Sequence, residues 1–550
     1  MIVNGKYKVL LKWNRQVIPR WRDSSEPGVM AVISKDNEEK SLSIYSTFDP
    51  EEQVSSLLKE WNTHKTIGGA ANILNFSHVP ALLPLLIEPA EYLLANSDSI
   101  SPILKKFSLN LLKTEESFTD LVQPNVNFSK RDISAFQHAS KLKTYLEANP
   151  RDVVALVDLA RVYTALGQNE KAKRAIQVAI NLYPNHIFVL RSAARFLIQN
   201  NESELALYQI NRSGRTLHDP WLLATKLAIE EILGKRHNQL GVARELAESQ
   251  KIDSFHLSEL RGAIASIHLV NGDIKQARKM LNKALEKPND NVVAQAMWAS
   301  SKYNISFNLR DEWIRDPHSS EAIYYQHDNE GNFSRAKDAA LKWFSDEPFS
   351  SRPLKAASFV SGLLEEFELT ETYSHHGLLL DKYDVGLKNN LIYALVGQDK
   401  MDEGVKHFQQ VIQWEKNNSD SFGGHTLANC GMILYRVGYF KDAEESYRKA
   451  IDIFSKNGSS ESKGIAVASM AREAILMDTP NAHSLLMEAK EMVIKLKSKA
   501  GYQVLKSLEK NKLENIAIFS EKFIRLGSDN KENNTQIANK LLTFKDNVCK

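Results

Sequence analysis

Apolar and small side chains recur at helical spacing over most of the chain, and the pattern is clearest in residues 155–184. A predicted first helix carries large apolar residues on one face and a predicted second helix carries mainly small ones, namely Leu156, Leu159, Tyr163, Ala172, Ile176 and Ala179. Gly167 separates the two helices and Pro184 ends the stretch. Because helices that pack closely need small residues where their backbones approach, this stretch predicts a helical hairpin.

The second-helix pattern is a small residue, a large apolar residue four positions later and a small one seven positions later. It starts at Ala172, Ala206, Ala277, Ala336, Gly404, Ala443 and Ala482, with a weaker match at Ala243. Neighbouring matches are 34 to 39 residues apart, except for 59 across a degenerate region at 289–318 and 68, which is two periods of 34. Several predicted turns carry glycine, at Gly167, Gly272, Gly331 and Gly438. The chain is therefore predicted to be an array of helical hairpins.

This array resembles the tetratricopeptide repeat family over roughly residues 140–490, most closely in its first repeat and in the repeat that contains Ala443. The resemblance implies a mostly α fold, a right-handed α-solenoid whose first helices line a concave groove that binds other molecules. The degenerate region at 289–318 departs from the family pattern, so the continuity of the solenoid there stays open.

The N-terminal part does not follow the repeat. Strand-forming residues dominate up to about residue 48, a polar run at 35–40 has the composition of a hairpin loop, and Gly68-Gly69 is expected to break a helix. We therefore predict a small α+β N-terminal domain. The predicted organisation is this domain over 1–112, a linker over 113–130, the solenoid with C-terminal capping helices over 131–526, and a polar spacer with a short terminal helix over 527–550.

Composition and charge narrow the class of protein. Of 550 residues, 43% are apolar and 25% are charged, which is typical of a soluble, folded chain. Only two cysteines occur, which favours a reducing compartment. No run of 18 apolar residues and no signal peptide is recognised, so we expect a cytoplasmic protein without a membrane partner.

No pattern of catalytic or metal-binding residues is convincing. His375 and His376 are adjacent and lack accompanying cysteine pairs, and Glu38-Glu39-Lys40 has nuclease-like spacing but lies in a predicted polar loop. Cys430 occupies a packing position of its repeat. We predict that the chain is not an enzyme and has no metal and no cofactor.

The family register places candidate binding residues on the first helices. Asp158 and Arg161 fall on the groove in one repeat, and Arg191 and Arg195 fall on it in the next. Three arginines would suit an acidic segment of a protein partner, although a solvated helix face with local ion pairs is an equal alternative. In the C-terminal half, side chains suited to clamping a peptide backbone or anchoring a partner are Asn389, Asn390, Tyr393, His425, Asn429, Tyr435 and Arg436.

A basic strip near the N-terminus interleaves cations with aromatic residues. Its cations are Lys6, Lys8, Lys12, Arg15, Arg20 and Arg22. This composition suits nucleic acid, but strands of a small domain whose aromatic residues face the core have it too. The net charge of +3 is too small to decide between them.

These features favour a non-catalytic scaffold or adaptor that binds a protein partner in the concave groove and assembles a multi-protein complex. The alternative is a nucleic-acid-associated or regulatory subunit of a larger machine, such as a bacterial anti-phage defence system. A steep loss of binding with rising salt would distinguish the alternative.

Overall fold

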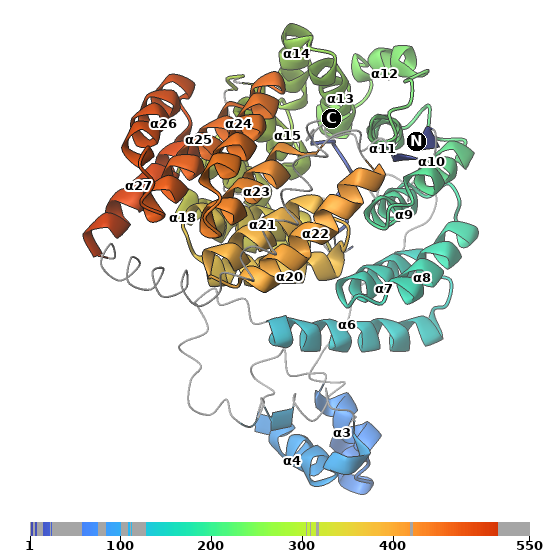
Figure 1. Ribbon diagram of the computed structural model, residues 1–550. Helices are drawn as coiled ribbons and strands as arrows, with labels where there is room; N and C mark the ends of the chain where they lie inside the picture. Colours follow the sequence, from blue (N-terminus) through green and yellow to red (C-terminus); the bar gives the residue numbers. More distant parts are fainter. Residues whose placement is uncertain are drawn as a thin grey trace. The chain divides into compact units, whose positions relative to one another are not determined.

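The computed structural model describes residues 2–3, 6–7, 15–22, 24, 58–74, 84–100, 108–109, 112, 128–303, 305–307, 310–314, 318–418 and 422–514. This part of the chain is mostly α-helical, as the pattern predicts (Figure 1). The predicted hairpin loop at 35–40, most of the predicted linker and the predicted terminal segment at 527–550 lie outside the described residues.

The elements before the repeats are β1 (Ile2–Val3), β2 (Lys6–Tyr7), α3 (Ile67–Leu74), α4 (Ile87–Ala95), the 3-10 helix η3 (Ser97–Ser99) and α6 (Phe128–Ala148). The helical pairs are α7 (Val153–Ala165) with α8 (Asn169–Leu182), α9 (Ile187–Gln199) with α10 (Ser203–Arg212), α11 (Pro220–Ile232) with α12 (Leu240–Ala247), α13 (Ser254–Val270) with α14 (Ile274–Ala284), α15 (Asp290–Tyr303) with α16 (Asp311–Ile314), α17 (Ser320–Glu330) with α18 (Phe333–Asp346), α19 (Arg352–Leu363) with α20 (Phe367–Leu380), α21 (Val385–Gly397) with α22 (Met401–Asn418), α23 (Gly424–Arg436) with α24 (Phe440–Lys456), and α25 (Ser460–Leu476) with α26 (Ala482–Leu496). A last helix, α27 (Lys499–Glu514), packs on α25 and α26 as the predicted cap would.

The described chain divides into two compact units. The first contains Met1–Pro19, Leu197–Asn211 and Arg215–Lys550, and the second contains Arg20–Phe196 and Arg212–Gly214. The two short strands, which pair antiparallel with Ile2 opposite Tyr7, fall in the first unit, whereas α3 and α4 fall in the second. The described residues therefore do not support a small α+β domain over 1–112. The right-handed sense of the solenoid stays a prediction.

Helix α3 corrects the expectation that Gly68-Gly69 breaks a helix. These glycines lie in the first turn of α3, and the helix break comes just before them at residues 64–66. Thr66 explains the start of the helix, because its hydroxyl accepts a hydrogen bond from the Gly69 N–H at 3.0 Å. Trp61 lies edge-on to Tyr92 and closes a small apolar cluster with α3 and α4.

The turn within nine of the ten helical pairs is built around one residue with a left-handed backbone, and the α15–α16 pair is the one for which no such residue is described. The predicted turn glycines all have positive φ, which confirms that part of the register, and the residues with this conformation at the turns are Gly167, Asn201, Gly234, Gly272, Gly331, Glu365, Asp399, Gly438 and Asp478. A side chain at positive φ is strained, so glycine is the natural choice where the chain reverses into the next helix. The second-helix marks are likewise buried where predicted, except Ala482, where Leu485, Ala489 and Val493 face the core instead.

We expect alanine at Gly438 to cost about 1–2 kcal/mol of stability, because φ is +89° there and an added Cβ would touch nothing, which leaves backbone strain as the only effect. Gly241 in α12 is the matched control, since an added Cβ would also meet open space but the backbone is helical. Urea unfolding should show the loss for Gly438→Ala and no loss for Gly241→Ala. Equal stability of the two variants would contradict the strained turn.

The degenerate region at 289–318 keeps a normal first helix and shortens the second. Helix α15 has 14 residues and packs against both α13 and α17, while α16 has only four residues. The buried side of α15 carries Val292, Val293 and Met297. The stack of first helices therefore continues through this region in the first unit, and the described part of the second helix there has only four residues.

Candidate functional site

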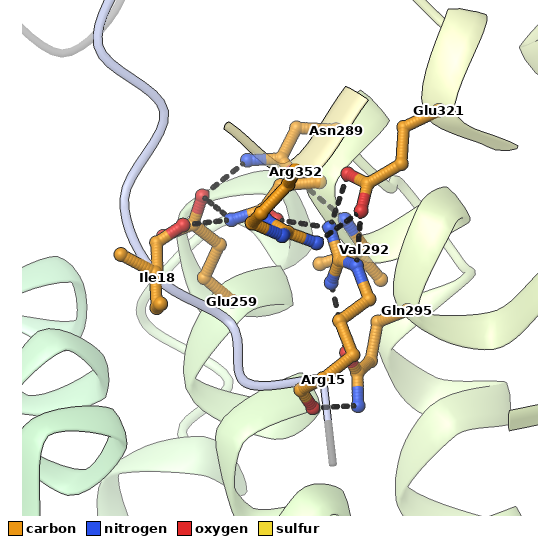
Figure 2. A network of polar contacts seen from close by, with 9 residues as sticks. Arg15, Ile18, Glu259, Asn289, Val292, Gln295, Glu321 and Arg352 are labelled. Atoms are coloured by element: carbon orange, nitrogen blue, oxygen red, sulfur yellow. Dashed lines mark hydrogen bonds and ion pairs between the residues drawn. The ribbon is translucent and has the colours of Figure 1, made fainter. Parts of the chain in front are cut away.

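Residues 15–19 cross the first helices of three successive repeats as a segment without helix or strand structure (Figure 2). Arg15, Gln16, Val17 and Pro19 are buried, although the sequence pattern places them outside the array. Their hydrogen-bond partners lie on α15 and α17, and Val17 packs beside Gly262 of α13. The chain thus carries its own extended ligand on the faces that the family resemblance assigns to partner binding.

The Arg15 guanidinium is surrounded by hydrogen-bond acceptors. Its Nε and Nη2 donate to the two carboxylate oxygens of Glu321 at 2.9 and 2.8 Å, its Nη1 donates to Gln295 Oε1 at 2.8 Å, and Nη2 also donates to Asn291 Oδ1 at 2.8 Å. The side chains of Arg15 and Glu321 are only 2% and 1% exposed. A two-pronged guanidinium–carboxylate pair of this kind is specific for arginine, because a lysine ammonium cannot present the same fork. We call Glu321, Gln295 and Asn291 the arginine site.

The same two amide side chains also hold the main chain of the segment. Gln295 Nε2 donates to the Arg15 carbonyl at 3.1 Å, and Asn291 Nδ2 donates to the Ile18 carbonyl at 2.9 Å. The two amides lie four residues apart on α15 and therefore share one face of that helix. Hydrogen bonds to carbonyl oxygens do not depend on the identity of the side chains, so this part of the site would accept any extended chain.

Val17 fills a shallow contact between two helices. It is fully buried, and a Cβ added to Gly262 on α13 would lie 3.3 Å from Val17 Cγ2 and 3.6 Å from Val292 Cγ2. Gly262 therefore leaves the room that Val17 occupies. Two side chains of the segment therefore make specific contacts, namely Arg15 and the small β-branched Val17 two positions later.

Contacts outside the segment hold the arginine site in place. Asn289 accepts from the Val292 N–H at 3.0 Å at the start of α15, and its amide donates to Glu259 at 2.8 Å. Gln295 Nε2 also donates to Ser266 at 2.9 Å. Arg352 on α19 donates to Glu321 and stacks over Trp343. The acceptors around Arg15 are therefore positioned largely by the array itself.

Trp21 and Ser24 make related contacts in the second unit, and here two predicted binding residues take part. Asp158 accepts from the Ser24 N–H at 3.2 Å and from the Ser24 hydroxyl at 2.5 Å. Arg161 Nε donates to the Trp21 carbonyl at 3.1 Å, and the Trp21 ring lies edge-on to Phe196. Asp158 and Arg161 thus lie on a first-helix face and bind an extended segment of the same chain. Arg191 and Arg195 lie on α9 and are buried.

The candidates in the C-terminal half contact neighbouring helices. Asn429 donates to the side chain and the carbonyl of Asn389 at 2.9 and 3.0 Å, and Asn390 donates to Ser358 at 2.8 Å. His425 is exposed, and its ring lies edge-on to Phe454 of α24. In this conformation the three asparagine and serine contacts join successive first helices to one another.

Tyr393 and Arg436 likewise bond to another repeat, whereas the Tyr435 ring packs against Phe440 and Tyr447 of its own hairpin. Burial raises the pKa of the Tyr393 and Tyr435 hydroxyls, and Tyr393 accepts a hydrogen bond from Arg472. Arg436 Nε donates to Glu473 at 2.6 Å, and Arg472 donates to the other oxygen of the same carboxylate at 2.7 and 3.0 Å. Two buried arginines therefore share one buried carboxylate.

The basic strip is not presented as one surface. Arg15 and Arg22 are buried, Arg20 is partly exposed, and Lys6 lies in β2. Lys8 and Lys12 lie outside the described residues. Nucleic-acid contact by this strip stays a prediction, and in this conformation Arg15 is committed to Glu321.

Among the described residues, no group of histidine, cysteine, aspartate or glutamate side chains could hold a metal ion. Cys430 is a buried free cysteine. No helix within the described ranges is long and apolar enough to cross a membrane.

Sequence reasoning missed the residues of the arginine site. Asn291 and Gln295 lie in the degenerate region, where the second-helix register gave no match, and Glu321 begins α17 just after it. The spacing of four between Asn291 and Gln295 on a predicted helix is the one signal that could have found them.

Glu415 makes the array sensitive to pH. It is buried at the end of α22, where burial raises its pKa to about 7 against the opposing hydrogen bonds from Thr426 and the Gly423 N–H. An acid whose folded pKa lies above its ordinary 4.5 favours folding below pH 4.5 and costs stability as the pH rises through 7. We expect Glu415→Gln to be more stable than the wild type by about 1–3 kcal/mol at pH 8 and equal to it at pH 4, measured by urea unfolding. A difference that stays constant with pH would contradict this.

Comparisons with known proteins agree with the repeat register. Residues 154–186 and 425–457 each match the tetratricopeptide repeat family, so the chain contains such repeats. A curated relative, the TPR repeat-containing protein MJ1428 of Methanocaldococcus jannaschii, is 22% identical over 367 residues, which cover 64% of this chain and 54% of the relative. The match thus spans about half of that relative's length.

Two solved structures are similar at lower identity. One is titled the crystal structure of the APC/C hetero-tetramer Cut9-Hcn1, with 13% identity, coverage of 84% of this chain and 96% of that chain, and a TM-score of 0.36. The other is yeast Tom70, with 15% identity, coverage of 72% and 96%, and a TM-score of 0.30.

Proposed function

We propose that this chain is a non-catalytic scaffold that binds an extended segment of a protein partner on its first-helix faces and so helps to assemble a multi-protein complex. Repeats of this family are built for protein interaction, which supports the general role. The partner and the complex are the part that needs an experiment.

The observation that carries the proposal is the way residues 15–19 are held. Paired amides on α15 clamp two main-chain carbonyls, and a buried carboxylate on α17 takes an arginine. Main-chain clamping combined with one or two side-chain sites is how protein surfaces bind extended peptides with affinity and with specificity. The first-helix faces are therefore chemically suited to an extended protein segment.

Site-specific photo-crosslinking tests the proposal. A photoreactive amino acid is placed at position 390 on the first helix α21 or at position 406 on the second helix α22, in the tagged full chain at native expression level. We expect a protein partner to crosslink at 390 and not at 406, and to stay bound after nuclease treatment, identified by mass spectrometry.

Two results would contradict the proposal. Crosslinks from position 406 alone would place the partner on the second helices. Loss of every captured protein after nuclease treatment would favour the nucleic-acid-associated alternative, since a bridging nucleic acid would then be the true ligand.

A further inference from the structure

We propose that residues 15–19 are a displaceable internal ligand, and that the partner segment that replaces them is extended and presents an arginine to Glu321. This inference rests on the proposed function and names the chemistry of its ligand. It assigns a specific role to the arginine site, which otherwise only holds the chain's own N-terminal segment.

The first argument is that the site does not depend on its present occupant. Glu321 keeps Arg352 as an ion-pair partner when Arg15 leaves, at 2.5 Å. Asn291 keeps Glu259 at 3.1 Å, and Gln295 keeps Ser266 at 2.9 Å. No buried charge is stranded when Arg15 leaves, because Arg352 still pairs with Glu321, and the amide oxygens of Asn291 and Gln295 are left to accept from a second ligand; Figure 2 shows Arg352 and Glu259 beside the arginine site.

The second argument is that the contacts define a ligand of limited chemistry. Four donor–acceptor pairs select an arginine, the Gly262 contact selects a small β-branched side chain two positions later, and the remaining contacts go to main-chain carbonyls. A protein segment of the form Arg-x-Val would satisfy the contacts described for Arg15 and Val17. A lysine would lose the two-pronged pairing with Glu321.

The third argument concerns how strongly the tethered segment competes with a partner for the arginine site. A tethered ligand competes at an effective concentration of about millimolar, so it masks the site against weak ligands and yields to a partner that adds contacts elsewhere on the array. The internal segment would thus exclude weak ligands from the arginine site, and only a partner that also binds elsewhere on the array would displace it.

Fluorescence anisotropy with a labelled peptide of residues 14–20 (NRQVIPR) tests the inference on the full chain. The variant Arg15→Gln vacates the site, and Val17→Asp is a second, independent way to expel the segment. We expect both variants to bind the peptide about 10- to 100-fold more tightly than the wild type, whose internal segment competes. Circular dichroism confirms that each variant is folded.

Matched controls distinguish binding at the arginine site from nonspecific binding of the peptide. In the Arg15→Gln background, Glu321→Gln should abolish peptide binding, whereas Glu312→Gln, which changes an exposed carboxylate paired with Arg310, should leave it unchanged. A peptide with lysine in place of the arginine that corresponds to Arg15 should bind about tenfold more weakly or worse.

Folded variants that fail to bind the peptide, or a wild type that binds it equally well, would overturn the inference. A partner that still crosslinks at position 390 in that case leaves the proposed function standing. Conversely, the absence of any first-helix crosslink removes the proposed function, whatever the peptide does. If the proposed function and the displaceable internal ligand are both correct, an excess of the peptide should release the crosslinkable partner.

Discussion

Replacing Arg15 with alanine is expected to speed amide hydrogen exchange in residues 15–18 by about 30- to 150-fold, which corresponds to about 2–3 kcal/mol of lost local stability. Arg15 donates all four of its hydrogen bonds to buried acceptors, so its removal leaves Asn291, Gln295 and Glu321 short of donors. The loss stays below that of a fully broken buried ion pair, because Arg352 still neutralises Glu321.

Arg335→Ala is the control for this measurement. Arg335 is an exposed residue of α18, so its loss should leave exchange in residues 15–18 at the wild-type rate. An Arg15→Ala protein that exchanges as slowly as the wild type would mean that the arginine does not anchor the segment. Exchange in α8, which lies outside the first unit, should be unchanged in both variants and serves as an internal reference.

The repeat architecture could be predicted because it is encoded locally. Ala172 and Ala443 are buried where two helices of one hairpin meet, and Gly438 has the positive φ that its turn requires. Each of these positions is fixed by neighbours within about one repeat of the sequence, so spacing alone reveals them. The same reasoning fails in the α15–α16 pair, where the second-helix spacing has no match and the described part of α16 has only four residues.

The occupant of the first-helix face could not be predicted, because its contacts are remote in sequence. Arg15 and Glu321 are 306 positions apart, and Ser24 and Asp158 are 134 apart. From composition alone, residues 1–22 are predicted to form either strands of a small domain or a basic surface that contacts nucleic acid. Nothing local distinguishes an arginine that meets phosphate from one that meets a buried carboxylate, since both need the same fork of donors.

The C-terminal candidates show the complementary limit of the register. It identifies the helices that carry Asn389, Tyr393 and Arg436, but it does not say whether the next repeat covers them. Arg472 on α25 reaches Tyr393, and Glu473 beside it reaches Arg436. A polar side chain on a first helix is therefore as often a link between repeats as a contact for a ligand.

Glu473 is where such a link should matter most for stability. Its carboxylate is fully buried and accepts from both Arg436 and Arg472. We expect Glu473→Gln to cost about 3 kcal/mol, because the amide keeps the shape but removes the nearest counter-charge of two buried guanidinium groups, which keep only the longer pairs with Asp399 at 3.5 Å and Glu365 at 3.4 Å. Urea unfolding followed by circular dichroism measures the loss. Glu488→Gln, which weakens the more exposed pair with Arg448, should cost less than about 1 kcal/mol.

The pH dependence of that loss separates charge from packing. Burial raises the pKa of Glu473, but Arg436 and Arg472 lower it more, so its folded pKa lies below 4.5. A carboxyl with a lowered pKa stabilises the fold above pH 4.5, and that contribution is lost as the pH falls through the folded pKa. The gap between the wild type and Glu473→Gln should therefore be full at pH 7 and shrink in acid. A gap of constant size would mean that the variant disturbs packing, and that the shared carboxylate is not what joins these repeats.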